Sequence, residues 1–431
     1  MNLPLNSKIR IRILDYARKT TQLSVYDQYL ENQYKYSKEE IELYQKNKFQ
    51  LIFRHHYENN EIYRKFLKEQ RFTNTAFTDI KEIPVITRDY FKNNPDNHMI
   101  KSFVHKTKYS GGSTGIPLTV HLSRESISNF WPGIWRAFNV CGVEPCDKIM
   151  MLAGPSLYNN RSFKRRIYDL VANFTVVSAF DLTPPVLLNA YNTLINNKIK
   201  AIYGYTSAVL VFLNYLEENN LKLNLKGIFT TSETFIPRVR QLARKYCNCD
   251  VIDTYGANDG GVSGFECNYH TGYHLNFERC LVEIVDHEII ITDLLNTASP
   301  FIRYKVGDFT SGDHIITDKC ECGRVLFRIQ SIAGRIHDFF PDINGNKIHS
   351  EFFNRVFDGD ELIKQYQIKY FPDECIVNIL CDKGTSLAHF QEKYMPVIGK
   401  RVKMPFKIVT NAEILSLSNG KVPIVINGAI S

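Results

Sequence analysis

Residues 109–118 read Tyr-Ser-Gly-Gly-Ser-Thr-Gly-Ile-Pro-Leu, a composition suited to a loop that binds phosphate. The glycines let backbone N–H groups turn toward an anion without interference from a Cβ, and the hydroxyls add short donors. The sequence argues against the lysine-ended phosphate loop of kinases and GTPases, because Gly115 is followed by Ile116 and Pro117. A plain hydroxyl-rich turn is the alternative. The anion-binding candidates are Ser110, Gly111, Gly112, Ser113, Thr114 and Gly115.

The composition is that of an ordinary globular protein with more than one core. At 431 residues, with 44% hydrophobic and 23% charged residues, we expect one large and one smaller domain. Lys and Arg exceed Asp and Glu by 53 to 45. The basic residues are scattered apart from Lys164–Arg166, which weakly favours anionic substrates and argues against a nucleic-acid partner.

The sequence carries no sign of secretion or of a membrane span. Residues 1–20 lack the apolar core of a signal peptide, and the longest apolar run, Ala208–Leu213, is far too short to cross a bilayer. Ten cysteines in such a chain fit reduced thiols better than a disulfide framework. We therefore expect a cytoplasmic protein.

Apolar strands alternate with helical segments through the middle of the chain, which predicts an α/β architecture. From Tyr273 onward the pattern changes to short strands and turns, which predicts a β-rich subdomain. Helices are expected at 38–55, 60–70, 124–138, 184–197, 206–219 and 236–246, and strands at 148–152, 172–179, 201–203, 227–231 and 251–254.

The 109–118 tract resembles the signature loop of adenylate-forming enzymes and is most similar to the phenylacetate–CoA ligase-like branch, which includes capsular-polysaccharide biosynthesis proteins. The resemblance implies that the loop holds the β- and γ-phosphates of ATP, with Mg²⁺ bridging the phosphates, while a carboxylate attacks the α-phosphorus. The products are acyl-AMP and pyrophosphate. Further motifs follow in the order of this family as far as Lys421.

The same resemblance implies a domain organisation. A large N-terminal domain of the adenylate-forming type, with parallel or mixed sheets, would span residues 1–335 and include the β-rich subdomain at about 265–330. A small mobile α+β domain would span residues 336–431.

Two strand-to-helix junctions are candidates for ligand contact. In Gly204–Ala208 the resemblance places Tyr205 and Ser207 at the acyl group, although a helix cap explains the segment equally well. It places Ser232 and Glu233 beside adenine and ribose, although Glu233 also suits a helix's first turn. Trp131, with Trp135 four residues on, is a further substrate candidate that would favour an aromatic acid, but tryptophans at this spacing are more often core residues.

Segment 253–261 carries two acids on a glycine-rich turn. The resemblance implies that Asp253, Tyr255 and Gly256 lie at the nucleotide, with the Tyr255 ring beside adenine. Asp259 stands where the family has a Mg²⁺-binding glutamate, and Asn258 stands where threonine is common. The aspartate is one methylene shorter, so the backbone must move closer or a water must intervene.

The resemblance assigns three residues near the domain junction. Asp308 would accept hydrogen bonds from both ribose hydroxyls, for which a carboxylate has two oxygens; an Asx turn is the alternative. Arg335 would reach the phosphate or ribose, and Asp338 would be the hinge of the C-terminal domain.

Lys421 follows Gly420 in a turn near the C-terminus. A lysine in such a turn is usually a solvated surface residue. The resemblance instead implies that Lys421 neutralises charge that develops between the carboxylate and the α-phosphate, which makes it the catalytic candidate.

Cys267, His270 and His274 precede a Cys320-Glu-Cys322 turn. Two thiolates on one turn plus a Cys and a His from another would complete a tetrahedral zinc site, while independently buried cysteines are the alternative. Members of the resembled branch often carry such a site. The Gly-Tyr-His274 context favours His274 over His270, so the predicted ligands are Cys267, His274, Cys320 and Cys322.

The function expected from these motifs is an ATP-dependent ligase that activates a small carboxylic acid. The acyl acceptor would be a thiol, as in CoA, or an amine of a sugar or amino acid, and the sequence does not separate them. A nucleotide-binding scaffold that has lost catalysis is the rival class, which Asn258 and Asp259 make conceivable. Phosphoryl transfer is a further alternative and would release ADP.

Overall fold

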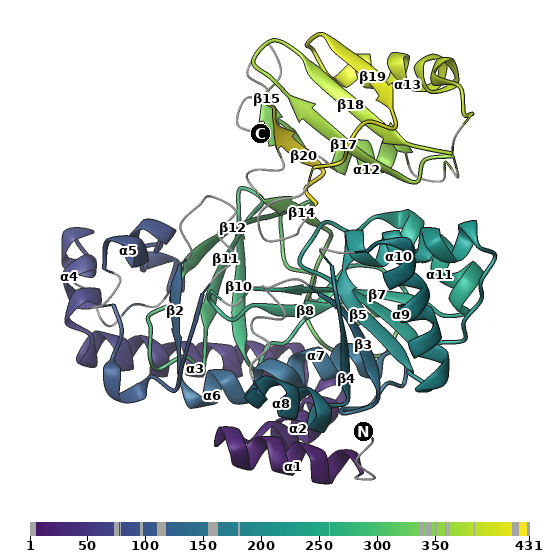
Figure 1. The fold of residues 1–431 in the computed structure, drawn as a ribbon. Helices are drawn as coiled ribbons and strands as arrows, with labels where there is room; N and C mark the ends of the chain where they lie inside the picture. Colours follow the sequence, from purple (N-terminus) through teal and green to yellow (C-terminus); the bar gives the residue numbers. More distant parts are fainter. Residues whose placement is uncertain are drawn as a thin grey trace. The chain divides into compact units, whose positions relative to one another are not determined.

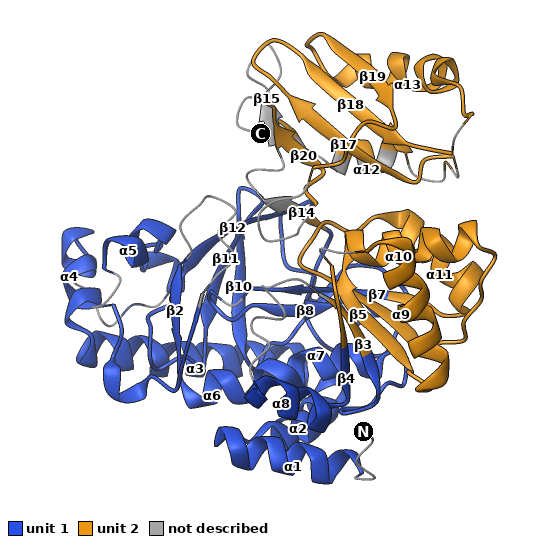
Figure 2. Cartoon of the chain, in the orientation of Figure 1, with its two compact units in different colours: residues 1–149, 160–175, 252–331 blue, residues 150–159, 176–251, 332–431 orange. Residues whose placement is uncertain are grey.

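The computed structural model describes residues 6–72, 77, 79–94, 98–109, 118–153, 163–179, 182–257, 259–335, 339–341, 347–349, 351–357, 360, 362–382, 384–415 and 422–428. The chain divides into two compact units, coloured blue and orange in Figure 2. The first contains residues 1–149, 160–175 and 252–331, and the second contains residues 150–159, 176–251 and 332–431.

The first unit begins with helices. The expected helices at 38–55 and 60–70 are confirmed as α3, Lys38–Asn59, and α4, Glu61–Glu69. A capping box starts α3, since the Ser37 hydroxyl accepts from the Glu40 N–H while the Glu40 carboxylate accepts from the Ser37 N–H. The remaining early helices are α1 Ser7–Arg18, α2 Gln22–Lys35, α5 Arg88–Asn93 and the 3₁₀ turns Ile80–Glu82 and Lys101–Phe103.

The glycine-rich tract connects the strands of a hairpin. Strand β1, Lys106–Tyr109, pairs antiparallel with β2, Thr119–Leu122, and Tyr109 lies opposite Thr119. Residues 110–117 themselves lie outside the described residues. The pairing therefore fixes where the two ends of the loop are held.

The single helix expected at 124–138 was wrong. The structure has two helices, α6 Arg124–Ser128 and α7 Phe130–Asn139, with the break at Asn129. Pro132 explains the break, because it has no N–H to donate to the carbonyl of Ser128.

The rest of the first unit is rich in short strands, which confirms the change of pattern expected after Tyr273. One antiparallel sheet has the order β10, β11, β12, and a second run of neighbours is β13, β9, β8, β7. The bounds are β7 Val251–Gly256, β8 Ser263–Phe265, β9 Tyr273–Leu275, β10 Cys280–Val285, β11 Glu288–Asp293, β12 Tyr304–Thr310 and β13 Arg328–Ile329, with α8 Phe163–Ala172 earlier in the chain. Strands β3 Ile149–Ala153 and β4 Phe174–Ser178 each begin in the first unit and end in the second.

In the second unit, β5, Ala201–Tyr205, runs parallel to β6, Gly227–Thr231, with Tyr205 opposite Thr231. Their carboxyl ends therefore lie side by side, and the residues that follow each strand meet at one edge. Helices α9 Pro184–Asn196, α10 Thr206–Glu218 and α11 Pro237–Cys247 pack around an apolar core and confirm the three helices expected here.

The C-terminal segment has a core of its own, in which Phe353, Ile368, Val377, Phe390 and Tyr394 are buried. Its mixed sheet has the order β19, β18, β17, β20 and is drawn in yellow-green to yellow in Figure 1. The elements are β14 Ile332–Arg335, β15 Phe339–Pro341, β16 Lys347–His349, α12 Glu351–Phe357, β17 Gln365–Tyr370, β18 Cys375–Leu380, α13 Leu387–Arg401, β19 Phe406–Thr410 and β20 Val425–Asn427.

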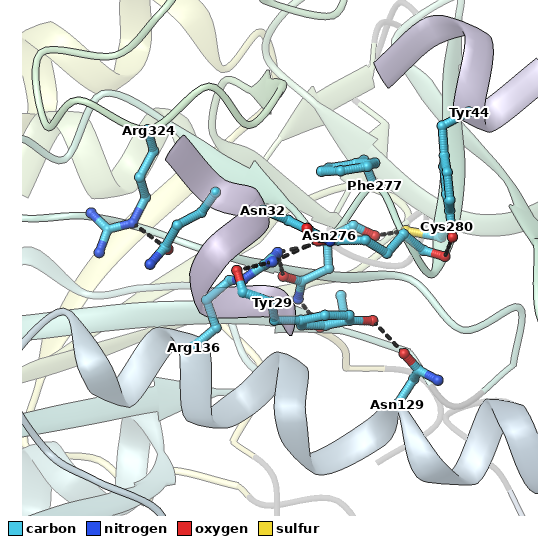
Figure 3. Close-up of polar contacts among 12 residues, drawn as sticks. Tyr29, Asn32, Tyr44, Asn129, Arg136, Asn276, Phe277, Cys280 and Arg324 are labelled. Carbon is cyan, nitrogen blue, oxygen red and sulfur yellow. Dashed lines mark hydrogen bonds and ion pairs between the residues drawn. The ribbon is translucent and has the colours of Figure 1, made fainter. Parts of the chain in front are cut away.

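A buried ion pair joins three segments of the first unit (Figure 3). Arg136 of α7 is fully buried and donates to Glu278 Oε1 at 2.6 Å and to Asn276 Oδ1 at 2.7 Å. It also donates to the backbone carbonyl of Tyr29 on α2 and lies 4.2 Å from the Tyr29 ring centroid. This network fixes α2 and α7 against the turn that leads into β10.

Candidate functional site

Two of the predicted nucleotide residues meet in the first unit. The Tyr255 hydroxyl, at the end of β7, donates to Asp308 Oδ2 on β12 at 2.9 Å. Asp308 is 5% exposed. The pairing of β11 with β12 shifts register between Glu288 and Ile290, opposite a stretch that holds Gly307 at φ +81°. Only glycine takes this φ without strain, so a bulge at Gly307 sets the direction of Asp308.

The two acids of segment 253–261 are each bound to a tyrosine that the sequence did not single out. Tyr273 Oη donates to Asp253 Oδ2 at 2.5 Å, and Tyr304 Oη donates to Asp259 Oδ2 at 3.1 Å. Both carboxylates are buried. Burial, together with the charge of Asp259, raises the pKa of Tyr304, so this phenol remains a hydrogen-bond donor.

The glycines after Asp259 allow the chain to pass close to β11. Gly260 and Gly261 have φ +83° and +72°, and a Cβ on Gly261 would lie 2.5 Å from Asp293 Oδ2. A larger residue at either position would displace the turn that carries Asp259.

In the second unit, the Glu233 carboxylate accepts hydrogen bonds from Ser207 and from Val422. The Ser207 N–H donates to its Oε2 at 2.8 Å, and the Ser207 hydroxyl donates to its Oε1 at 3.1 Å. The Val422 N–H also donates to Oε1, at 3.1 Å. Since Ser207 stands in the first turn of α10, the carboxylate satisfies one backbone N–H group at a helix N-terminus. Ser232, just before, has φ +69°.

The predicted substrate residues Tyr205 and Trp131 are both buried, in different units. Tyr205 is part of the core around α10. Trp131 stacks on Trp135 with ring centroids 6.3 Å apart and lies 5.2 Å from the Phe174 ring. These contacts explain the packing of both side chains, and their contact with substrate stays a prediction.

The four predicted zinc ligands converge. One ligand atom from each of Cys267, His274, Cys320 and Cys322 lies within 4.8 Å of all the others. Cys267 Sγ is 3.8 Å from Cys320 Sγ, and His274 Nε2 is 3.4 Å from Cys322 Sγ. The contact with the Cys267 thiol lowers the pKa of Cys322.

The structure separates the two histidine candidates. His274 lies on β9 and faces the cysteines, whereas His270 Nδ1 lies 3.4 Å from Glu266 Oε2. Gly323, at φ +85°, donates its N–H to the Cys320 carbonyl at 2.8 Å, which closes the turn that carries Cys320 and Cys322. The arrangement offers three sulfurs and one imidazole nitrogen, a donor set typical of structural zinc.

Several predicted residues lie outside the described part of the chain. These are the loop residues Ser110, Gly111, Gly112, Ser113, Thr114 and Gly115, the hinge candidate Asp338 and the catalytic candidate Lys421. Arg335 and Gly256 end strands β14 and β7. In the residues that are described, no helix combines the length and apolar character needed to cross a membrane.

The sequence of residues 20–183 matches the LuxE acyl-protein synthetase family. Protein CapK of Staphylococcus aureus is 24% identical over 309 residues, which cover 68% of this chain and 68% of CapK. Indoleacetate–lysine synthetase of Pseudomonas savastanoi is 27% identical over 137 residues, which cover 31% of this chain and 34% of that protein.

Solved structures of adenylate-forming ligases share the fold. 2-Hydroxyisobutyryl-CoA ligase in the postadenylation state, in complex with 2-HIB-AMP, superposes with a TM-score of 0.73 at 18% identity, covering 92% of this chain and 91% of the ligase. ATP-bound MatB from Rhodopseudomonas palustris gives a TM-score of 0.51 at 12% identity, covering 76% and 67%. At these identities the likeness is one of fold.

Proposed function

We propose that the chain is an adenylate-forming ligase and that it activates a small carboxylic acid as acyl-AMP. Its fold and its relatives support this proposal, in line with the family resemblance drawn from the motifs. The acyl group then passes to a thiol, such as that of CoA, or to an amine in capsule or exopolysaccharide biosynthesis. Relatives of both kinds exist, since one is named as a lysine synthetase and another as a CoA ligase.

The contact between Tyr255 and Asp308 is the observation that carries this proposal. It puts an aromatic ring next to a buried carboxylate, and the two come from strands 53 positions apart in sequence. A planar base can stack on such a ring, and a carboxylate can accept from both hydroxyls of a ribose. The pair therefore suits a nucleoside. When ribose binds, Asp308 either loses its hydrogen bond from Tyr255 or accepts from Tyr255 and from the ribose together.

Support for Lys421 comes from its neighbour. The Val422 N–H bonds to Glu233, which is itself a nucleotide candidate, so the chain next to Lys421 lies at the carboxyl ends of β5 and β6. Ligands of open α/β sheets bind at that edge. We therefore keep Lys421 as the catalytic residue and Asp338 as the hinge of a C-terminal domain that begins near residue 336.

The Asp259 carboxylate is suited to be the one ligand that the protein provides to Mg²⁺. This ion prefers carboxylate oxygens, keeps several waters and takes its other ligands from substrate phosphates. Tyr304 holds the carboxylate through Oδ2. The proposed part of Asp259 is to position the ion, which would neutralise phosphate charge when bound.

Acid-dependent exchange of labelled pyrophosphate into ATP tests the proposal, with a panel of aromatic and aliphatic acids. An adenylate-forming ligase exchanges label with at least one acid. A scaffold that has lost catalysis exchanges none, and a phosphoryl-transfer enzyme releases ADP instead of AMP. With the acid known, CoA and amines can be compared as acceptors by the product each forms.

We expect Asp308→Ala to raise the KM for ATP about tenfold to a hundredfold, because hydrogen bonds to a charged acceptor contribute about 1.5–3 kcal/mol. The KM for the acid should change little. Tyr255→Phe is the matched control, since it keeps the ring and removes only the hydroxyl that bonds to Asp308. An unchanged KM for ATP in Asp308→Ala would exclude the ribose assignment.

We expect about one equivalent of zinc in protein purified without chelator, held as a structural ion by the four-residue cluster. Cys322→Ser should remove most of the metal and lower the melting temperature, because the ion links two turns of the β-rich region. Cys141→Ser lies outside the cluster and should keep the full equivalent. Elemental analysis measures the zinc content of each protein. Wild-type protein without zinc but with an unchanged melting temperature would refute the site.

A further inference from the structure

Large apolar side chains project into solvent from α1 and α8, two helices of the first unit that pack against each other (Figure 1). Tyr16 on α1 is 90% exposed and Phe163 on α8 is 77% exposed, more than any other large apolar side chain of the described residues. Ile9, Ile13 and Ile167 on the same two helices are exposed as well. We name these five residues the α1–α8 patch. Single exposed apolar residues are common, whereas a group of them marks an interaction surface.

On each helix the patch residues form a stripe. Ile9, Ile13 and Tyr16 are four and three positions apart, so they lie on one side of α1. Phe163 and Ile167 are four positions apart, so they lie on one side of α8. Each helix has other residues that are buried. Packing of the core therefore does not explain why the two stripes are apolar.

Contacts between α1 and α8 hold the two stripes in one region of the surface. Arg10 of α1 donates to the backbone carbonyls of Leu170 and Val171 on α8, both at 3.0 Å. These carbonyls are in the last turn of α8, where the helix itself supplies no donor. Arg18 of α1 lies 5.5 Å from the centroid of the Tyr168 ring.

The exposed charged residues of the two helices are all basic. They are Lys8, Arg12, Lys164 and Arg166. The acids of the two helices are engaged within the fold, since Asp15 accepts from the N–H groups of Gln22 and Leu23, and Asp169 pairs with Arg165 at 2.9 Å. The α1–α8 patch is therefore an apolar surface with a positively charged border.

We propose that the α1–α8 patch binds the surface of a membrane that contains anionic lipids. Apolar and aromatic side chains bordered by Lys and Arg are typical of helices that lie in the lipid–water interface. The apolar side chains enter the boundary of the acyl chains, and the cations remain at the negatively charged headgroups. The Tyr16 ring, with its polar hydroxyl, suits the level of the headgroups.

The charge of the patch favours a lipid surface over a second copy of this chain. Two copies joined through the patch would bring their basic borders together, and like charges across an interface are unfavourable. An anionic membrane supplies the opposite charge over its whole surface and accepts an apolar side chain without a preformed pocket. The inference concerns where the protein is held and does not depend on the proposed function.

Cosedimentation of the full-length protein with vesicles tests the apolar part of the patch. The protein should bind vesicles made of equal parts of phosphatidylcholine and phosphatidylglycerol. Phe163→Gln combined with Ile167→Gln should weaken this binding about tenfold or more, because two apolar side chains no longer leave water. Both positions are exposed, so the fold should persist. Leu51→Gln, which changes an exposed leucine on α3, is the matched control and should bind like the wild type.

The charged border is tested with the same vesicles. Vesicles of phosphatidylcholine alone should bind the wild type about tenfold more weakly or less, because they present no net negative charge. Lys164→Gln combined with Arg166→Gln should weaken binding to the mixed vesicles about tenfold and make it less sensitive to salt. Lys65→Gln combined with Lys68→Gln removes two exposed lysines of α4 and should bind like the wild type.

A fluorescent reporter shows whether position 163 enters the lipid. Phe163→Trp should shift its emission to shorter wavelength when the mixed vesicles are added, because the indole leaves water. Leu51→Trp should show no shift. The natural Trp131 and Trp135 are buried and contribute a constant background.

A wild-type protein that stays in solution with both kinds of vesicle would overturn the proposal, and so would full binding by both double variants of α8. A dimer that forms in the wild type and is lost in Phe163→Gln with Ile167→Gln would also overturn it, because a second copy would then cover the patch. Melting curves check that the variants are folded. If the apolar variant of α8 is not, Tyr16→Gln on α1 takes its place, with the same loss of binding expected.

Discussion

Replacing Lys421 by alanine is expected to lower acid-dependent ATP–pyrophosphate exchange by about a hundredfold to a thousandfold, the loss typical when one preorganised donor to transition-state charge is removed. The physical reason is that a carboxylate and an α-phosphate, both negative, must approach each other. A cation between them stabilises this arrangement more than the separated substrates. Nucleotide affinity should remain close to that of the wild type.

The contact at Val422 makes the experiment specific. Glu233 holds the Val422 N–H, which does not depend on the side chain at position 421, so alanine there should leave the local backbone in place. Lys400→Ala, an exposed lysine on α13, is the matched control and should retain full exchange. Full exchange in Lys421→Ala would remove this residue from the mechanism, while the assignment of Asp308 would still stand.

Replacing Arg136 by alanine is expected to destabilise the first unit by about 3–5 kcal/mol, because it leaves Glu278 buried without its counter-charge. Asn276 and the carbonyl of Tyr29 lose a donor as well (Figure 3). Urea unfolding followed by circular dichroism should show an earlier first transition. Binding of nucleotide should weaken only as the unfolded fraction grows.

A double replacement separates the ion pair from simple packing. Arg136→Met with Glu278→Met removes both charges, and it should recover much of the stability lost in Arg136→Ala. Lys35→Ala removes an exposed pair with Glu31 and should leave the transition in place. An Arg136→Ala protein as stable as the wild type would mean that water reaches Glu278. It would also mean that the network does not hold α2 and α7 against the turn that leads into β10.

The motifs of this chain could be recognised from the sequence because each depends on a few adjacent residues. Helices such as α9 and α11 follow from local apolar spacing and from proline at the first turn. The four-residue Cys/His cluster was predicted from Cys267 and His274 together with a Cys-x-Cys turn. Apolar spacing did not predict the break at Asn129, because spacing takes no account of the hydrogen bond that Pro132 cannot make.

By itself the sequence determined the α/β class, the family resemblance and the short segments that carry Tyr255, Asp308 and the proposed zinc ligands, since local backbone preferences and residue chemistry decide these. Only the tertiary structure decided which side chains meet. Arg136 bonds to Glu278, which is 142 positions away in the sequence, and the Val422 N–H donates to Glu233, which is 189 positions away. Lys108 and Arg279 both lie over the Phe130 ring. These partners depend on the order of the strands and on the paths of the loops that connect them. The sequence around a charged residue does not show which residue lies opposite it in the fold.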